Sequence, residues 1–201
     1  VAFCEFQIEN ASLVHWQIFE AETIPYGASW QEKLRQLPQV RGRDLALAHA
    51  HFGHYMGELT LGFIQKHQIE PDFIASHGHT IFHFPKEKMT LQIGDGSAIA
   101  AATGYPVISD FRAMDVALGG QGAPLAPIAD RLLFSGYDFY LNLGGIANIT
   151  CHANDKFIAF DIGGANQLLN FLAQQLNKPF DERGALAASG TLHAGLLAKA
   201  N

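Results

Sequence analysis

The chain has 201 residues, of which 48% are hydrophobic and 16% are charged, and its formal net charge is −6. These proportions are typical of a globular enzyme and exclude an intrinsically disordered chain. The negative charge, with no block of basic residues, argues against nucleic acid or an anionic membrane as a partner, and no apolar run approaches the length of a membrane span.

The cysteines and the first residues indicate a compartment. Cys4 and Cys151 lie in apolar, strand-like surroundings, where a reduced and buried thiol is expected. The start, VAFCEF, lacks the basic and apolar regions of a signal peptide. We therefore expect a cytoplasmic protein. Because the chain does not begin with Met and ends inside a helical pattern, we also expect it to be part of a longer chain.

The first third of the chain predicts a hairpin followed by helices. Residues 2–7 and 13–19 are strand-like runs joined by turn-forming residues, which predicts an antiparallel hairpin. Ser29 and Glu32 have the spacing of a capping box at the start of a short helix. Residues 44–66 carry apolar side chains every three or four positions, which predicts a long helix. Its glycines each cost about 1 kcal/mol relative to alanine, and we expect close packing on a sheet to offset this.

The rest of the chain alternates short strands with helices, which predicts the α/β class and a mixed sheet. Strands are expected at residues 73–75, 81–83, 91–93, 107–109, 139–143, 146–151 and 157–160, and helices at residues 97–103, 127–134 and from 164 or 166 to 177. A new sheet unit is expected near Tyr137, so we divide the chain into residues 1–136 and 137–201.

The strongest candidate site follows the strand at residues 107–109. The chain there becomes polar with Asp110, Arg112 and Asp115, and then enters a glycine run with the sequence GGQG at residues 119–122. A strand that ends in a polar, glycine-rich loop is typical of an α/β active site, because the loop faces the crevice at the carboxyl ends of the strands. The carboxylates are candidate acid or base groups. Asp110 and Arg112 equally fit a pair that only fixes the loop.

The segment SHGHT, which includes His77 and His79, follows the expected strand at residues 73–75. Strand alternation would place His77, His79 and His83 on one face, which permits a zinc site. His49, His51, His54 and His67 lie along the long helix, where we prefer solvated or packing histidines to a metal site.

Two further loops have two interpretations each. Gly144 and Gly145, flanked by Asn142 and Asn148, either adopt positive φ and present N–H groups to a triphosphate or form a simple hairpin turn. Asp161 at an expected strand end either orients Mg²⁺-bound water or caps the following helix.

Several of these segments together resemble one family. SDFR, DVALGGQGAPL, LNLGGIANIT and FDIGGAN are similar to the signature segments of the anhydro-N-acetylmuramic acid kinases, over about residues 71–190. These are sugar kinases of the actin/hexokinase/Hsp70-like ATPase superfamily. The resemblance implies two ATPase lobes, each with a ribonuclease-H-like mixed sheet and flanking helices, the second beginning near Tyr137. It also implies ATP and Mg²⁺ as cofactors and a small sugar as substrate, and it leaves a homodimer open.

The resemblance implies a role for each candidate residue. Asp115 falls where the family has its catalytic base, and Gly119, Gly120, Gln121 and Gly122 would line the sugar and the γ-phosphate. The sugar pocket would also use His77, Gly78, His79 and Thr80, and the nucleotide would contact Asn142, Gly144, Gly145, Asn148 and Asp161. The chain departs from the family pattern at His79, where the family has Gln, and at Ile162, Gly164, Ala165 and Asn170.

The resemblance implies an ATP-dependent kinase that opens the 1,6-anhydro ring of anhydro-N-acetylmuramic acid with water and phosphorylates O6, in cell-wall recycling. A non-catalytic sugar- or nucleotide-binding relative is the alternative, and a zinc hydrolase that uses the histidines is a third class. The family carries a first phosphate loop before the segment that matches Val1, and more of its second lobe beyond Asn201. We therefore expect the 201 residues alone not to turn over ATP.

Overall fold

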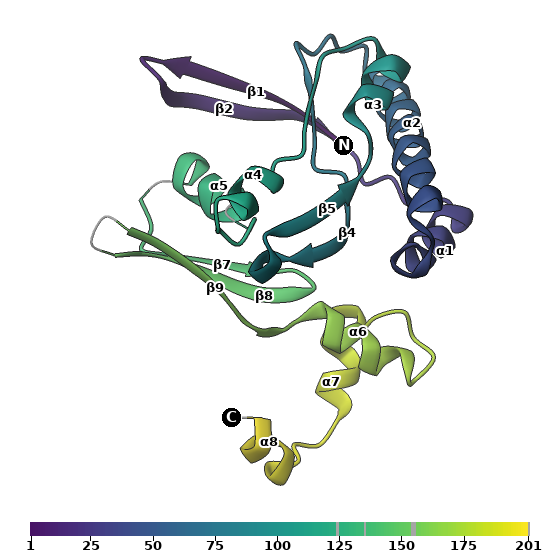
Figure 1. Ribbon diagram of the computed structural model, residues 1–201. Coiled ribbons are helices and arrows are strands. Elements are labelled where there is room, and N and C mark those ends of the chain that lie inside the picture. The colour runs from purple at the N-terminus through teal and green to yellow at the C-terminus, as the bar shows by residue number, and fades with distance from the viewer. Residues whose placement is uncertain (124, 135, 154–155, 201) are drawn as a thin grey trace. The chain divides into compact units, whose positions relative to one another are not determined.

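The computed structural model describes residues 1–123, 125–134, 136–153 and 156–200 (Figure 1). The chain mixes helices with small sheets, which confirms the predicted α/β class. It divides into two compact units, Val1–Leu125 and Ala126–Asn201, and each unit is considered by itself below. The predicted lobe boundary near Tyr137 falls between α5 (Leu125–Leu133) and β7 (Phe139–Leu143), inside the second unit, and the assignment of lobes stays a prediction.

The first unit begins with the predicted antiparallel hairpin. Strands β1 (Ala2–Glu9) and β2 (Ser12–Ala21) pair along their whole length. Asn10 and Ala11 form the turn with φ values of 50° and 61°. Two successive residues with positive φ match the right-handed twist of the flanking strands. The turn conformation and the alternating sequence pattern therefore both indicate a hairpin.

The helices that follow are α1 (Ala28–Gln36), the short 3-10 helix η1 (Leu37–Gln39) and α2 (Gly42–His67). The predicted capping box is wrong, because α1 is capped by Gly27 without a side-chain hydrogen bond and Ser29 lies inside the helix. Glu32 instead accepts hydrogen bonds from Arg35 and Gln36 on the exposed face.

The core of the first unit forms where α1 and α2 meet strand β5. Phe52 and Ile93 are completely buried, and Trp30 stacks on Tyr55 and meets the edge of Phe52. The remaining members of this cluster are Leu34, Leu37 and Ala48, with Tyr26, Leu45, Met56 and Ile81 packed around them. The apolar periodicity of residues 44–66 therefore predicted the buried face of α2 correctly.

Gly53 and Gly57 of α2 serve helix packing rather than packing on a sheet, which corrects the sequence prediction. A Cβ at Gly53 would lie 2.8 Å from Ala98 Cβ, and one at Gly57 would lie 2.6 Å from Ala102 Cβ. Both alanines belong to α3 (Gly96–Thr103), which lies against α2 (Figure 1). Small residues on both helices let the two backbones approach closely.

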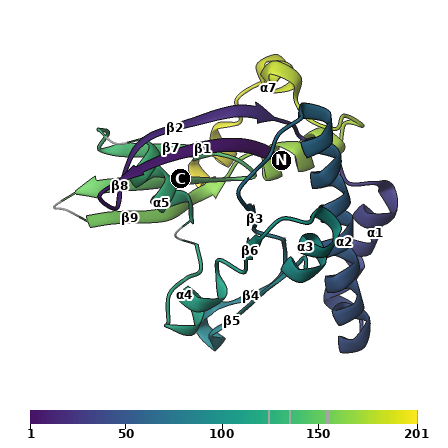
Figure 2. The ribbon, with the colours of Figure 1, turned by 90° about the horizontal axis from the view of Figure 1, so that it is seen from above.

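The site elements of the first unit are short. Strands β3 (Ile74–Ser76) and β6 (Val107–Ser109) pair in parallel, and β4 (His79–Phe84) pairs antiparallel with β5 (Met89–Ile93) across the 3-10 helix η2 (Pro85–Glu87). Figure 2 shows β3 beside β6, with α3 next to them. The helix α4 (Ala113–Ala117) was missed, because five residues are too few to show a period.

The second unit contains α5 (Leu125–Leu133) and an antiparallel sheet of β7 (Phe139–Leu143), β8 (Ile146–Ala153) and β9 (Lys156–Gly164) in the order β7-β8-β9. Thr150 Oγ1 donates a 2.7 Å hydrogen bond to Asp130 Oδ2, and both residues are buried, so this bond fixes α5 on the sheet. The chain continues through α6 (Asn166–Gln174), η3 (Glu182–Gly184), α7 (Ala185–Ser189) and α8 (Ala194–Ala200).

Over the described residues, strand pairing is divided among four small sheets, three antiparallel and one parallel. Cys4 and Cys151 are free and half-buried. Among the described helices, none combines the length and the apolar character that crossing a bilayer requires.

Candidate functional site

A pocket of about 280 Å³ opens where the parallel strands β3 and β6 end. Ser76 and His77 line it from β3, and Ser109 and Asp110 line it from β6. Its other walls come from α2, β5 and the start of α3, through His49, Thr90, Leu91, Gln92, Gly94, Asp95 and Gly96. The carboxyl ends of parallel strands are the usual place for a ligand site in an α/β protein.

Asp110 enters this pocket wall with a strained backbone. Its φ is 60°, in the left-handed region that few residues other than glycine occupy. Its side chain is exposed and forms no hydrogen bond or ion pair with another described residue. Strain of this kind is found at functional sites more often than elsewhere, so Asp110 is a candidate site residue on structural grounds as well.

A β-bulge at Ile81 decides which side chains of β4 and β5 face one another. Thr80 pairs with Gln92 and His83 pairs with Thr90, so the extra residue puts these four polar side chains on one face. His79 pairs with buried Ile93 on the opposite face. The predicted single face of His77, His79 and His83 is therefore wrong, because strict alternation is broken by the bulge.

Arg112 links this polar face to the glycine loop. Its Nε donates a 2.5 Å hydrogen bond to the carbonyl oxygen of Gly122, its Nη1 lies 3.3 Å from Thr80 Oγ1, and its Nη2 lies 3.2 Å from His83 Nε2. The proposed pairing of Asp110 with Arg112 is not seen among the described residues. Arg112 does fix the loop, as one interpretation of the sequence predicted, but it does so through Gly122 and the β4–β5 hairpin and not through Asp110.

The ring of His83 lies between Arg112 and Thr90. Arg112 Nη2 is 3.3 Å from His83 Nδ1 and 3.2 Å from His83 Nε2, and His83 Nδ1 is also 3.2 Å from Thr90 Oγ1. Burial, and then the positive charge of Arg112, lower the pKa of His83 below its ordinary value. The ring therefore serves as a neutral bridge between Arg112 and β5.

Asp115 lies against the glycine run that follows it. Its Oδ2 accepts a 2.6 Å hydrogen bond from the N–H of Gly122, and its carbonyl oxygen accepts one from Gly120 N–H. A Cβ at Gly120 would overlap the Asp115 carboxylate, and Gly122 has a φ of 63° and is buried. Gly119 has a φ of 95°, and Gln121 is exposed. The structure therefore brings Asp115 and residues 119–122 together, although none of them lines the pocket.

The SHGHT segment is divided between the pocket and the core. His77 lines the pocket, whereas His79 lies edge-on to Phe52 and Tyr26, where burial lowers its pKa. Gly78 has a φ of 70°, and a Cβ there would overlap the Ile93 carbonyl oxygen. Packing against β5 therefore explains Gly78 without a ligand. Among the described residues, no group of three or more His, Cys, Asp or Glu side chains is arranged to hold a metal ion.

In the second unit, three of the predicted nucleotide residues form one row across the sheet. Asn142 pairs with Asn148, and Asn148 pairs with Asp161, so the three side chains project from the same face of neighbouring strands. Asp161 lies inside β9 rather than at a strand end, because β9 continues through a bulge to Gly164.

The turn at Gly144 and Gly145 joins β7 to β8 as a hairpin, and neither glycine has positive φ, which corrects that part of the prediction. Their carbonyl oxygens accept hydrogen bonds from the N–H groups of Ala165, Asn166 and Gln167. The start of α6 is therefore capped by this turn, and its N-cap, Ala165, has no side-chain bond. The interpretation of Asp161 as the helix cap is wrong.

A family model described as anhydro-N-acetylmuramic acid kinase matches residues 4–201. The chain belongs to the anhydro-N-acetylmuramic acid kinase family. Curated relatives with this name include one from Rhizorhabdus wittichii, 36% identical over 94% of this chain and 57% of the relative. One from Methylobacterium nodulans is 43% identical over 70% of this chain and 40% of the relative. One from Coxiella burnetii is 42% identical over 81% of this chain and 46% of the relative.

The family match is wider than the segment of residues 71–190 that carries the signature motifs. The chain spans about half the length of the curated relatives it matches. Both compact units lie within the match, so the hairpin β1–β2 and the helices after α6 belong to the family's sequence as well.

Sequence reasoning missed most of the pocket residues in this family member, and three of them make hydrogen bonds that shape the pocket: His49, Gln92 and Asp95. His49 Nδ1 accepts the N–H of Gly94, and Asp95 caps α3 through the N–H of Ser97. Gln92 donates to Thr80 and Thr90, and its buried Oε1 has no partner among the described residues. For Gln92 the one available signal was its alternation with Thr90, the residue just before the expected strand at residues 91–93. His49 and Asp95 depend on contacts between distant segments.

Proposed function

We propose that the full-length protein is an ATP-dependent kinase of 1,6-anhydro-N-acetylmuramic acid that acts in cell-wall recycling. Membership of the family over residues 4–201 is the observation that carries this proposal. The contact of Asp115 with the glycine loop and the pocket at the ends of β3 and β6 support it, because they supply a carboxylate and a sugar-sized space in one unit.

The proposed reaction couples hydrolysis of the anhydro bridge to phosphoryl transfer. The oxygen of water forms a bond to the anomeric carbon, and the bond from that carbon to O6 breaks. O6 takes the bonding electrons and attacks the γ-phosphorus of ATP, and ADP leaves. One proton of the water must go to a base, and a positioned carboxylate contributes about 10²–10⁴-fold to such a step.

Asp115 is the proposed base. Its Oδ2 is occupied by Gly122 N–H, and its other oxygen has no hydrogen bond from another described residue. The same contacts fit a residue that only braces the loop, so the two roles are separated by experiment below. Asp110, which lines the pocket, is the next candidate.

The pocket is the proposed site for part of the sugar. At about 280 Å³ it lies near the lower end of ligand sites, which begin at about 300 Å³, and so it suits one ring rather than a nucleotide. Its lining has two carboxylates and no Lys or Arg, which disfavours phosphate groups and favours sugar hydroxyl donors. Thr80 and His77 would contribute from the SHGHT segment, with Thr80 positioned by Arg112 and Gln92.

The row of Asn142, Asn148 and Asp161 is the proposed nucleotide side. Its oxygen donors fit a hydrated Mg²⁺, which prefers carboxylate and amide oxygens and keeps its water. When bound, Mg²⁺ would neutralise charge on the phosphates of ATP. The backbone of Gly144 and Gly145 would approach the phosphates. We also propose that this part of the chain belongs to a ribonuclease-H-like lobe, and that the protein is cytoplasmic. A homodimer stays a prediction without structural support.

Turnover by the full-length protein tests the function. With the anhydro sugar, ATP and ¹⁸O-labelled water, we expect N-acetylmuramic acid 6-phosphate with one ¹⁸O at the anomeric position. Binding of the sugar and an ATP analogue by calorimetry without any turnover would instead support the non-catalytic alternative.

A further inference from the structure

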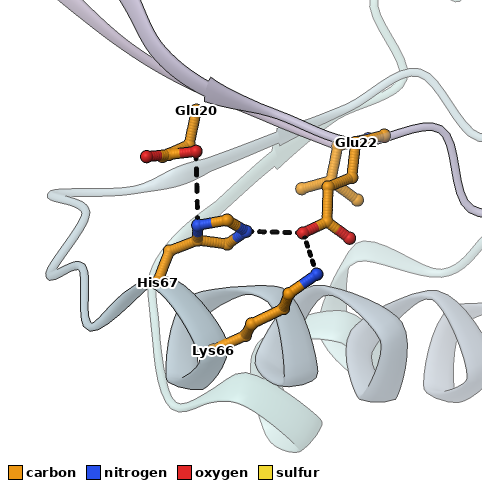
Figure 3. A network of polar contacts seen from close by, with 5 residues as sticks. Glu20, Glu22, Lys66 and His67 are labelled. Atoms are coloured by element: carbon orange, nitrogen blue, oxygen red, sulfur yellow. Dashed lines mark hydrogen bonds and ion pairs between the residues drawn. The ribbon is translucent and has the colours of Figure 1, made fainter.

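The end of the hairpin β1–β2 is joined to the end of α2 by four charged side chains. His67 Nε2 lies 2.5 Å from Glu22 Oε1, and His67 Nδ1 lies 3.3 Å from Glu20 Oε2. Lys66 Nζ lies 2.6 Å from the same Glu22 oxygen. Figure 3 shows the imidazole between the two glutamates, with Lys66 reaching the same Glu22 oxygen from below.

Both ring nitrogens of His67 face a carboxylate, and this decides which form of the ring fits. Only the imidazolium can donate from both nitrogens, whereas a neutral ring directs one lone pair at a carboxylate oxygen. The Glu22 contact is the shorter one, so the neutral ring keeps its proton on Nε2 and loses the contact between Nδ1 and Glu20.

The surroundings of Glu22 keep its carboxylate charged. Hydrogen bonds from Lys66 and then from His67 lower the pKa of Glu22, so this carboxylate is ionised throughout the range in which histidines change charge, pH 5 to 8. The His67 side chain is 17% exposed and packs against Phe63 at 4.6 Å between ring centres. The positions of Lys66 and His67 in the last turn of α2 also favour positive charge there.

We propose that Glu20, Glu22 and His67 form a pH-sensitive latch that holds the hairpin β1–β2 against the carboxyl end of α2 and loosens when His67 loses its proton. The groups that face His67 from the hairpin and its exit are the two glutamates, and the one charged neighbour on its own helix is Lys66, which reaches Glu22. Lys66 also contacts Glu22 and does not depend on the proton of His67, so the latch loosens on the Glu20 side without releasing the hairpin.

Hydrogen exchange of the full-length protein tests the latch directly. Backbone protection of residues 2–21 is measured at pH 5.5, 6.5 and 7.5, corrected for the intrinsic exchange rates, with the interior of α2 as the internal reference. We expect protection of the hairpin to fall about two- to fivefold between pH 5.5 and 7.5, the effect of one partly exposed ion pair.

Two variants identify the cause. Glu20→Gln replaces the carboxylate by an amide that can accept from the protonated ring or donate to the neutral ring, so its hairpin protection should not change with pH. Glu5→Gln is the matched control and should behave as wild type, because Glu5 is exposed on β1 and has no hydrogen bond or ion pair with another described side chain. Wild-type protection that is independent of pH, or an unaltered fall in Glu20→Gln, would overturn the latch.

Discussion

The carboxylate of Asp115 accepts a 2.6 Å hydrogen bond from the backbone N–H of Gly122, and Arg112 holds the carbonyl oxygen of that same glycine. Both backbone polar groups of the buried residue Gly122 are therefore tied to α4 and its N-cap. This arrangement fixes the glycine loop relative to Asp115, so the same carboxylate is positioned for proton transfer and used as a support. An Asp115→Asn substitution separates the two roles. The amide oxygen can still accept the hydrogen bond from Gly122 N–H, but it cannot take a proton from water.

Gly53→Ala should destabilise the full-length protein by about 1–3 kcal/mol, because the added Cβ would lie 2.5 Å from the Asp95 carbonyl oxygen and overpack the contact of α2 with α3. Gly62→Ala is the matched control on the same helix, since a Cβ there meets nothing within 4 Å. We expect it to stabilise by about 0.5–1 kcal/mol. Urea denaturation measures both, and equal effects would show that α2 and α3 do not pack in this way.

Helix α2 and the hairpin β1–β2 were predictable because their periods extend over many residues and their turns have clear signals. The bulge at Ile81 was not, because one inserted residue leaves the composition of β4 unchanged yet moves His83 to the face opposite His79. The pocket was predicted only through His77 and Asp110, since His49, Asp95 and Gln92 meet by tertiary contacts. The row of Asn142, Asn148 and Asp161 depends on strand register, which the loop motifs alone do not reveal.

Gly145→Ala should weaken ATP binding by about tenfold or more and leave sugar binding unchanged, if backbone N–H groups of this turn contact phosphate oxygens. The fold should tolerate the change, because the new Cβ would lie 3.8 Å from Gln167 Cβ and the backbone does not require positive φ. Gly163→Ala in the facing strand, with nothing within 4 Å, is the control. Calorimetry with an ATP analogue and with the sugar gives both affinities, and an unchanged ATP affinity would reject the assignment.

His83 should make the protein less stable in mild acid. Its pKa is lowered in the folded state, so the unfolded state binds more protons as the pH falls below about 6.5. The stabilisation is therefore complete above that pH and is lost as the pH falls towards the lower pKa of the folded state. Between pH 7.5 and 5.5 we expect His83→Gln to lose less unfolding free energy than wild type in urea titrations. An equal loss in both proteins would mean that His83 is not held neutral by Arg112.

The most direct measurement is kcat of the full-length Asp115→Asn variant beside Asp161→Asn. Asparagine keeps an oxygen for Gly122 N–H but cannot take a proton, so Asp115→Asn should fold, bind the sugar and ATP normally, and lose at least about a hundredfold in kcat. Asp161→Asn should mainly weaken ATP and Mg²⁺. A kcat for Asp115→Asn within a few-fold of wild type would contradict the assignment of Asp115 as the base. Asp110, which lines the pocket, would then be the next residue to test as the base.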